Sequence, residues 1–162
     1  MRGKTEQMSI DETDGRIVRE LSQNGRDSFR TIASKVGLSP ATLIERVKRL
    51  EGAGIVLGYS ACINHFEMGY SFAAIIEVTI RKGALLEVQK RIAALPGVVS
   101  VYDVTGEYDS IVVARVKSRT EFSRLVKRIL ALEHVERTNT HVVLNVVKEN
   151  ERMMPNPISA HE

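Results

Sequence analysis

The chain has 162 residues, of which 43% are hydrophobic and 27% are charged, and this length suffices for one compact domain or two small ones. A single cysteine excludes an intramolecular disulfide framework and a cysteine-rich metal site. No apolar run approaches the roughly 18 residues of a membrane span, and the N-terminus lacks the apolar core of a signal peptide, so we expect a cytoplasmic protein that makes no membrane contact.

Two helices are predicted first. Ser9 is the expected N-cap of one, with Glu12 as its capping-box partner, and Asn24-Gly25 ends it. The second carries its apolar face between Phe29 and Val36 and stops at Gly37, which can take the positive φ of a tight turn.

A third helix begins at Ser39-Pro40, because serine caps free N–H groups and proline suits the first helical turn. Residues 55–63, IVLGYSACI, then have strand character. Three helices followed by a short β segment predict a winged helix-turn-helix.

The third helix lies in a basic part of the chain. Residues 26–50 carry six lysines and arginines against two acidic residues, whereas the whole chain has a net charge of +3. The second helix of such a pair can enter the DNA major groove with its N-terminal residues at the base edges. The glycine turn, the cap and the clustered charge together favour DNA binding over a solvated helix face. The candidate DNA-binding residues are Arg30, Ser39, Pro40, Thr42, Glu45, Arg46, Lys48 and Arg49.

Glu45 is the acidic member of this set, and two roles are open for it. It can accept a hydrogen bond from a cytosine amino group, or it can pair with Lys48 or Arg49 along the helix. The ion pair is the favoured interpretation.

The second half of the chain predicts the order β-α-β-β-α-β, which is the ferredoxin-like arrangement of an α+β fold. The strands are expected at residues 72–80, 98–105, 110–117 and 135–148, and the helices at 84–95 and 119–132. Ser118 and Glu121 suggest a capping box for the second of these helices. An internal repeat of 37 residues supports the arrangement. It relates Leu85, Val88, Ile92, Leu95 and Val98 to Phe122, Leu125, Ile129, Leu132 and Val135.

Four segments follow from this. We expect a DNA-binding domain over residues 1–59, a hinge over 60–70, the ferredoxin-like domain over 71–148 and a polar tail over 149–162. No catalytic constellation, metal-ligand set or phosphate-cradling glycine motif is recognised, so an enzyme is not expected, and neither is a cofactor or a metal.

The stretch GLSPATLIERVKRLEGAGIVLGY at residues 37–59 resembles the helix-turn-helix of the Lrp/AsnC family, the leucine-responsive or feast/famine transcription regulators. The resemblance continues through DETDGRIVRELSQNGR and through the second half with its TGEYD loop, over about residues 9–148. It implies a homodimer that assembles further, often to an octamer, and an amino-acid effector bound between dimers.

The loop VTGEYDSI joins the two middle strands, and it has two interpretations. It is either a hairpin whose aspartate caps its own turn, or the effector site that the resemblance implies. In the second case Asp109 accepts from the ligand ammonium, and backbone N–H groups near Gly106 bind the carboxylate. The candidate effector residues are Thr105, Gly106, Glu107, Tyr108 and Asp109, with Thr138 and Thr140 from a neighbouring subunit.

The sequence thus predicts a transcription regulator that binds double-stranded DNA at a roughly palindromic operator, as expected for a dimer, and responds to an amino acid. The alternative is an architectural protein that oligomerises and compacts DNA without an effector.

Overall fold

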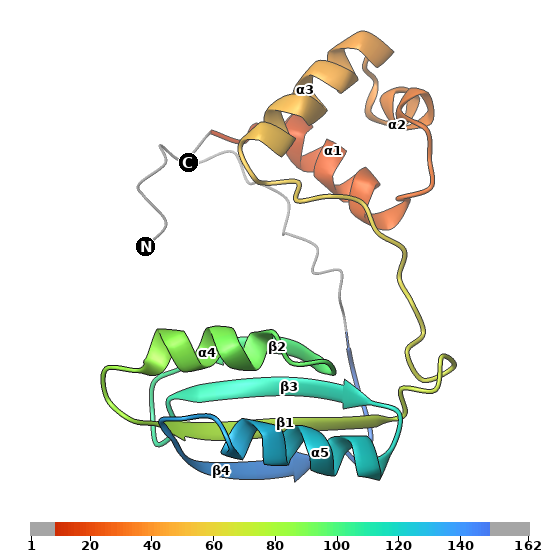
Figure 1. The fold of residues 1–162 in the computed structure, drawn as a ribbon. Helices are drawn as coiled ribbons and strands as arrows, with labels where there is room; N and C mark the ends of the chain where they lie inside the picture. The colour runs from red at the N-terminus through yellow and green to blue at the C-terminus, as the bar shows by residue number, and fades with distance from the viewer. Residues whose placement is uncertain (1–8, 150–162) are drawn as a thin grey trace. The chain divides into compact units, whose positions relative to one another are not determined.

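The computed structural model describes residues 9–149, and the chain divides into two compact units after Cys62 (Figure 1). The expected tail over 149–162 lies outside the described residues except for Glu149. In the first unit three helices enclose a small core: α1 (Glu12–Gln23), α2 (Phe29–Val36) and α3 (Pro40–Gly52). The core is built from aliphatic side chains that all three helices contribute, namely Ile17, Ile32, Ala33, Val36, Leu43, Val47 and Leu50.

The turn between α2 and α3 has the predicted form. Gly37 adopts φ 74°, and the N–H of Leu38 donates to the carbonyl of Ala33 at 2.9 Å, which closes a Schellman-type end. The side chain of Ser39 then accepts from the N–H of Thr42 and caps α3. The predicted helix-turn-helix is confirmed.

The predicted cap of α1 is wrong. Asp11, and not Ser9, is the N-cap, and Asp14 is its capping-box partner in place of Glu12. The two side chains satisfy each other's backbone N–H groups, at 2.7 and 3.3 Å. Starting the helix here turns Asp14 inward, where it is fully buried.

The strand predicted over residues 55–63 is also absent. Residues 55 and 56 form a bend, and their N–H groups both donate to the carbonyl of Leu50 at the end of α3. Residues 57–63 have no strand partner among the described residues. A β-branched, alternating pattern favours extended backbone, but a strand needs a neighbour to complete its hydrogen bonds.

The second unit has the predicted β-α-β-β-α-β order: β1 (Phe72–Ile80), α4 (Leu85–Ala93), β2 (Val98–Asp103), β3 (Ser110–Val116), α5 (Arg119–Leu130) and β4 (Val135–Val142). The strands form one antiparallel sheet in the order β2-β3-β1-β4. Alternate residues of β1, Ala74 to Ile80, share one core with residues of α4 and α5, so both helices cover the same face. The α+β fold is confirmed.

β4 is shorter than predicted. It ends at Val142 and not at residue 148, because its neighbour β1 begins at Phe72 and so offers no backbone to residues 145–148. The last bond joins the N–H of Val143 to the carbonyl of Ala73 at 3.0 Å. The capping box at α5 is half formed. Ser118 accepts from Glu121 N–H, but the Glu121 carboxylate accepts from the N–H of Lys117.

The 37-residue repeat extends to backbone conformation. Gly97 before β2 and His134 before β4 occupy equivalent positions and both have positive φ, 88° and 73°. Only the first needs glycine for space as well, because a Cβ at Gly97 would lie 2.8 Å from Cγ1 of Val116.

Candidate functional site

The exposed face of α3 carries most of the candidate DNA-binding residues. Leu43, Val47 and Leu50 turn the opposite face into the core, which leaves Ser39, Pro40, Thr42, Glu45 and Lys48 exposed. Arg30 is exposed on α2. The helix-turn-helix therefore exposes the N-terminal half of α3 to solvent.

Arg46 and Arg49 have partners inside the unit. Arg46 Nη1 donates to Asp11 Oδ2 at 2.7 Å and to Asp14 Oδ1 at 2.8 Å, and Arg49 Nη2 donates to Asp14 Oδ2. We call Asp11, Asp14, Arg46 and Arg49 the aspartate clamp. It joins α3 to the start of α1, so it fixes the orientation of α3 relative to α1.

Hydrogen bonds between the side chains of the clamp shift the pKa values of Asp11 and Arg46. The hydrogen bond from Arg46 lowers the pKa of Asp11, and hydrogen bonds to Asp11 and then Asp14 raise the pKa of Arg46. The sequence interpretation missed Asp14. The signal was present, because an aspartate three residues after another at a helix start is a capping-box pattern.

Glu45 does not form the favoured ion pair within residues 9–149, since Arg49 turns toward Asp14. Lys35, a further cation of the basic segment, bridges Glu20 at 3.2 Å and Asp27 at 2.8 Å. In the described part of the chain, Arg30 and Lys48 are exposed cations without an ion pair. They are the candidates best able to meet phosphates.

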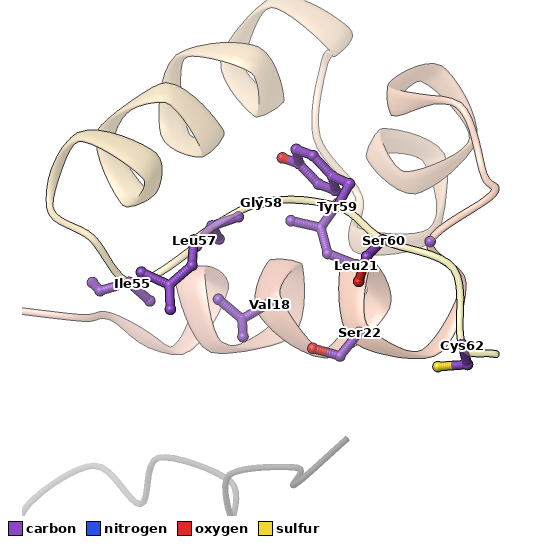
Figure 2. Close-up of a pocket in the computed structure, with 11 residues that line it drawn as sticks. Val18, Leu21, Ser22, Ile55, Leu57, Gly58, Tyr59, Ser60 and Cys62 are labelled. Atoms are coloured by element: carbon purple, nitrogen blue, oxygen red, sulfur yellow. The ribbon is translucent and has the colours of Figure 1, made fainter. Parts of the chain in front are cut away.

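A groove of about 350 Å³ lies between α1 and the segment that follows α3 (Figure 2). Its lining includes Val18, Leu21, Leu57 and Tyr59 and contains no charged side chain. The Tyr59 hydroxyl donates to Glu51 at 2.9 Å, and burial, then Glu51, raises the pKa of Tyr59 to about 12. The segment that leaves the first unit forms one wall of this groove, and the groove presents no cation to a phosphate.

The loop between β2 and β3 brings Thr105 to Asp109 together at one end of the sheet. Asp109 Oδ2 accepts from the N–H of Ile80 at 2.8 Å, so its carboxylate bonds to β1 and does not cap its own turn. Its other carboxylate oxygen accepts no hydrogen bond within the described chain. Gly106 has φ 129° and open space where a Cβ would stand.

Arg137 joins this loop to β4, and the sequence interpretation missed it. Its guanidinium lies 3.0 Å from Glu107 Oε1 and 5.2 Å from the centre of the Tyr108 ring. An arginine at an exposed strand position carries no sequence signal of such a contact.

Thr138 and Thr140 lie apart from the loop in the same chain. They stand opposite Val78 and Ile76 of β1, whose side chains face the helices, and both threonines are half-buried. Arg137 stands opposite Thr79, on the other face. One chain therefore assembles the loop with Arg137 and not with the two threonines.

The face of the sheet away from the helices carries a polar cluster. Glu77 Oε2 accepts from Asn139 Nδ2 at 2.7 Å and lies 3.1 Å from His141 Nε2. The hydrogen bond with His141, then that with Asn139, lowers the pKa of Glu77.

Among residues 9–149, no helix is both long and apolar enough to cross a membrane.

Two domain models of one protein family match the chain. The AsnC-type helix-turn-helix domain matches residues 10–51, and the Lrp/AsnC ligand binding domain matches residues 73–153. An HTH-type transcriptional regulator of Pyrococcus furiosus is 40% identical, over 91% of this chain and all of its own length. The leucine-responsive regulatory protein of Haemophilus influenzae is 34% identical over 90% of each chain.

Solved structures are similar over the same range. A feast or famine regulatory protein from M. tuberculosis, complexed with L-methionine, has TM-score 0.80 and 31% identity, and covers 91% of this chain and 100% of its own. A transcriptional regulator from Neisseria meningitidis, also complexed with L-methionine, has TM-score 0.82 and 30% identity, and covers 90% and 96%.

Proposed function

Because the chain belongs to the Lrp/AsnC family, whose members are transcriptional regulators and not enzymes, we propose that it binds a specific, roughly palindromic DNA operator through α3 and that an amino acid bound at the β2–β3 loop modulates this binding. The protein acts as a cytoplasmic homodimer that assembles further.

The proposed DNA binding rests on one observation: two sides of α3 have different roles. The aspartate clamp holds the helix from one side, and the exposed N-terminal half is left for base edges. Arg30 and Lys48 meet phosphates, which position the protein without reading sequence. Arg46 and Arg49 act first as positioning residues, since their guanidinium groups already hold Asp14.

The effector part rests on the loop. One Asp109 oxygen is fixed by Ile80 and the other is open to a ligand ammonium. Gly106 exposes backbone N–H groups to a carboxylate, and Tyr108 forms a wall. Thr138 and Thr140 reach this site only from a neighbouring subunit. The complexes of two relatives with L-methionine support a ligand of this class.

The DNA part is tested by selecting binding sites from random DNA and then measuring affinity against salt. Each lost phosphate contact lowers the salt slope by about 0.9. We expect this loss in Arg30→Ala and in Lys48→Ala, and not in Lys82→Ala, a control that removes an exposed cation of the second unit. An unchanged slope and footprint in both α2 and α3 variants contradicts the assignment.

The effector part is tested by Asp109→Asn. The asparagine oxygen keeps the bond to Ile80 and the amide removes the charge, so the thermal shift caused by L-methionine or another amino acid should disappear. Glu107→Gln is the control, because that carboxylate already pairs with Arg137. No shift with any of the twenty amino acids in the unmodified protein refutes the effector part.

The architectural alternative has one observation in its favour, since the Asp109 bond to Ile80 is also a purely structural role for the loop. Uniform, length-dependent coating of DNA without a selected sequence supports this alternative, and a sharp footprint refutes it.

A further inference from the structure

A second cavity, of about 390 Å³, lies within the second unit, at the end of the β2–β3 hairpin opposite the loop site. Its walls come from the turn between α4 and β2, the end of β3 and the first three turns of α5. Four cationic side chains line it, Arg115, Lys117, Arg124 and Arg128, against one carboxylate, that of Glu121. The lining of this cavity therefore carries more positive than negative charge.

The Glu121 carboxylate does little to balance Lys117, Arg124 and Arg128. Glu121 Oε2 accepts from the backbone N–H of Lys117 at 3.0 Å, and no ion pair of Glu121 occurs within residues 9–149. The Lys117 ammonium lies 5.2 Å from the centre of the Tyr70 ring, which also lines the cavity. That contact holds a cation at the rim without neutralising it.

Arg124 and Arg128 stand four residues apart on α5, and both are exposed. Like charges at this spacing destabilise a helix, and in the described part of the chain neither arginine has a carboxylate partner. A bound anion between them removes this repulsion. Guanidinium groups also match phosphate oxygens in pairs, which an ammonium does not.

The floor of the cavity is a fixed part of the fold. Gly97 packs against Val116, and its carbonyl accepts from the N–H of Arg115 at 2.8 Å. Val116 and Leu125 below it are buried. The cations therefore surround a rigid apolar base and are not scattered over a convex surface.

We propose that this cavity binds a phosphate group, held by Arg124 and Arg128 with Lys117 and Arg115 at the rim. The phosphate comes either from a free phosphorylated small molecule or from the DNA backbone. The second source rests on the proposed DNA binding, and the first does not.

The test compares two double variants of the full chain that remove the same charge from the same helix. Arg124→Ala with Arg128→Ala removes two cavity cations. Arg119→Ala with Lys127→Ala removes two exposed cations of α5 that do not line the cavity. All proteins are titrated with pyrophosphate by calorimetry at low salt, and their DNA affinity is measured against salt.

For a free phosphorylated ligand, the unmodified protein binds pyrophosphate, the cavity variant binds it about tenfold more weakly or worse, and the control variant binds it normally. For backbone phosphates, the salt slope of DNA binding falls by about 1.8 in the cavity variant only. Either result supports the site. The proposed phosphate site is overturned if the two double variants have equal effects in both assays. It is also overturned if the cavity variant has no effect in the pyrophosphate titration and none on the salt slope of DNA binding. Failure of the unmodified protein to bind DNA refutes the proposed function and leaves the pyrophosphate result to decide this proposal.

Discussion

Replacing Asp14 by asparagine is expected to loosen the first unit, because Asp14 is the one member of the aspartate clamp that is fully buried. Its side chain is 0% exposed, whereas those of its partners Arg46 and Arg49 are 28% and 47% exposed. Its oxygens accept from Arg46, Arg49 and the N–H of Asp11. Asparagine keeps the shape and one acceptor, but it turns a buried N–H₂ toward an arginine donor.

The size of the effect follows from burial. Breaking a buried ion pair costs about 3–5 kcal/mol when the remaining charge has no access to water. Here both arginines reach solvent in part, so their charges are rehydrated, and the cost is closer to that of one unsatisfied buried group plus the lost attraction. We expect a loss of about 2–3 kcal/mol in the free energy of opening of the first unit.

Amide hydrogen exchange measures this opening in the first unit separately from the second. The core amides of α3, such as those of Val47 and Leu50, should exchange about 30- to 150-fold faster in Asp14→Asn, since 1–2 kcal/mol already changes the equilibrium about 5- to 30-fold. Exchange in β1 and β3 should not change.

Asp11→Asn is the matched control. Asparagine remains a good N-cap, and the Asp11 carboxylate is half exposed, so the lost contact with Arg46 should cost no more than about 1 kcal/mol. If Asp14→Asn exchanges no faster than Asp11→Asn, the clamp does not hold α3 and the reasoning is wrong.

Two further predictions concern the second unit. Gly97→Ala should destabilise it by about 2–3 kcal/mol, because the new Cβ meets Val116 at 2.8 Å and the residue keeps positive φ, and thermal unfolding measures the loss. The effect of Glu77→Gln should depend on pH. The pKa of Glu77 is lowered on folding, so the stabilisation from its charge is fully present above the ordinary value of 4.5 and disappears as pH falls through the folded value. The melting temperatures of Glu77→Gln and the unmodified protein should therefore converge as pH falls below 4.5 through the lowered pKa of Glu77.

Each of these two predictions has its own control. His134→Gly changes the repeat-related position, where a side chain already tolerates positive φ, so it should be neutral or stabilising by up to about 1 kcal/mol. Equal loss in both variants would remove the steric explanation for Gly97. A gap in melting temperature between Glu77→Gln and the unmodified protein that is as large at pH 3 as at pH 7 would show that Glu77 acts through packing and not through charge.

Local chemistry and periodicity were readable in the sequence. The cap at Ser39, the glycine turn at Gly37 and the 37-residue repeat depend on neighbouring residues and on helix and strand periods, and all three are present in the structure. Strand β1 was predicted with its observed bounds, Phe72–Ile80, because apolar β-formers are bounded there by Lys82-Gly83.

The errors occurred where a partner distant in sequence decides the outcome. Residues 55–63 have strand composition but no neighbouring strand within residues 9–149, and β4 stops near the start of β1. The sequence by itself determined the two folds and the basic helix. Tertiary structure alone decided that Arg46 and Arg49 pair with Asp14, that Asp109 accepts from Ile80 and that four cations line one cavity. Each of these contacts joins different helices, strands or loops, so it depends on how these elements pack and not on local spacing.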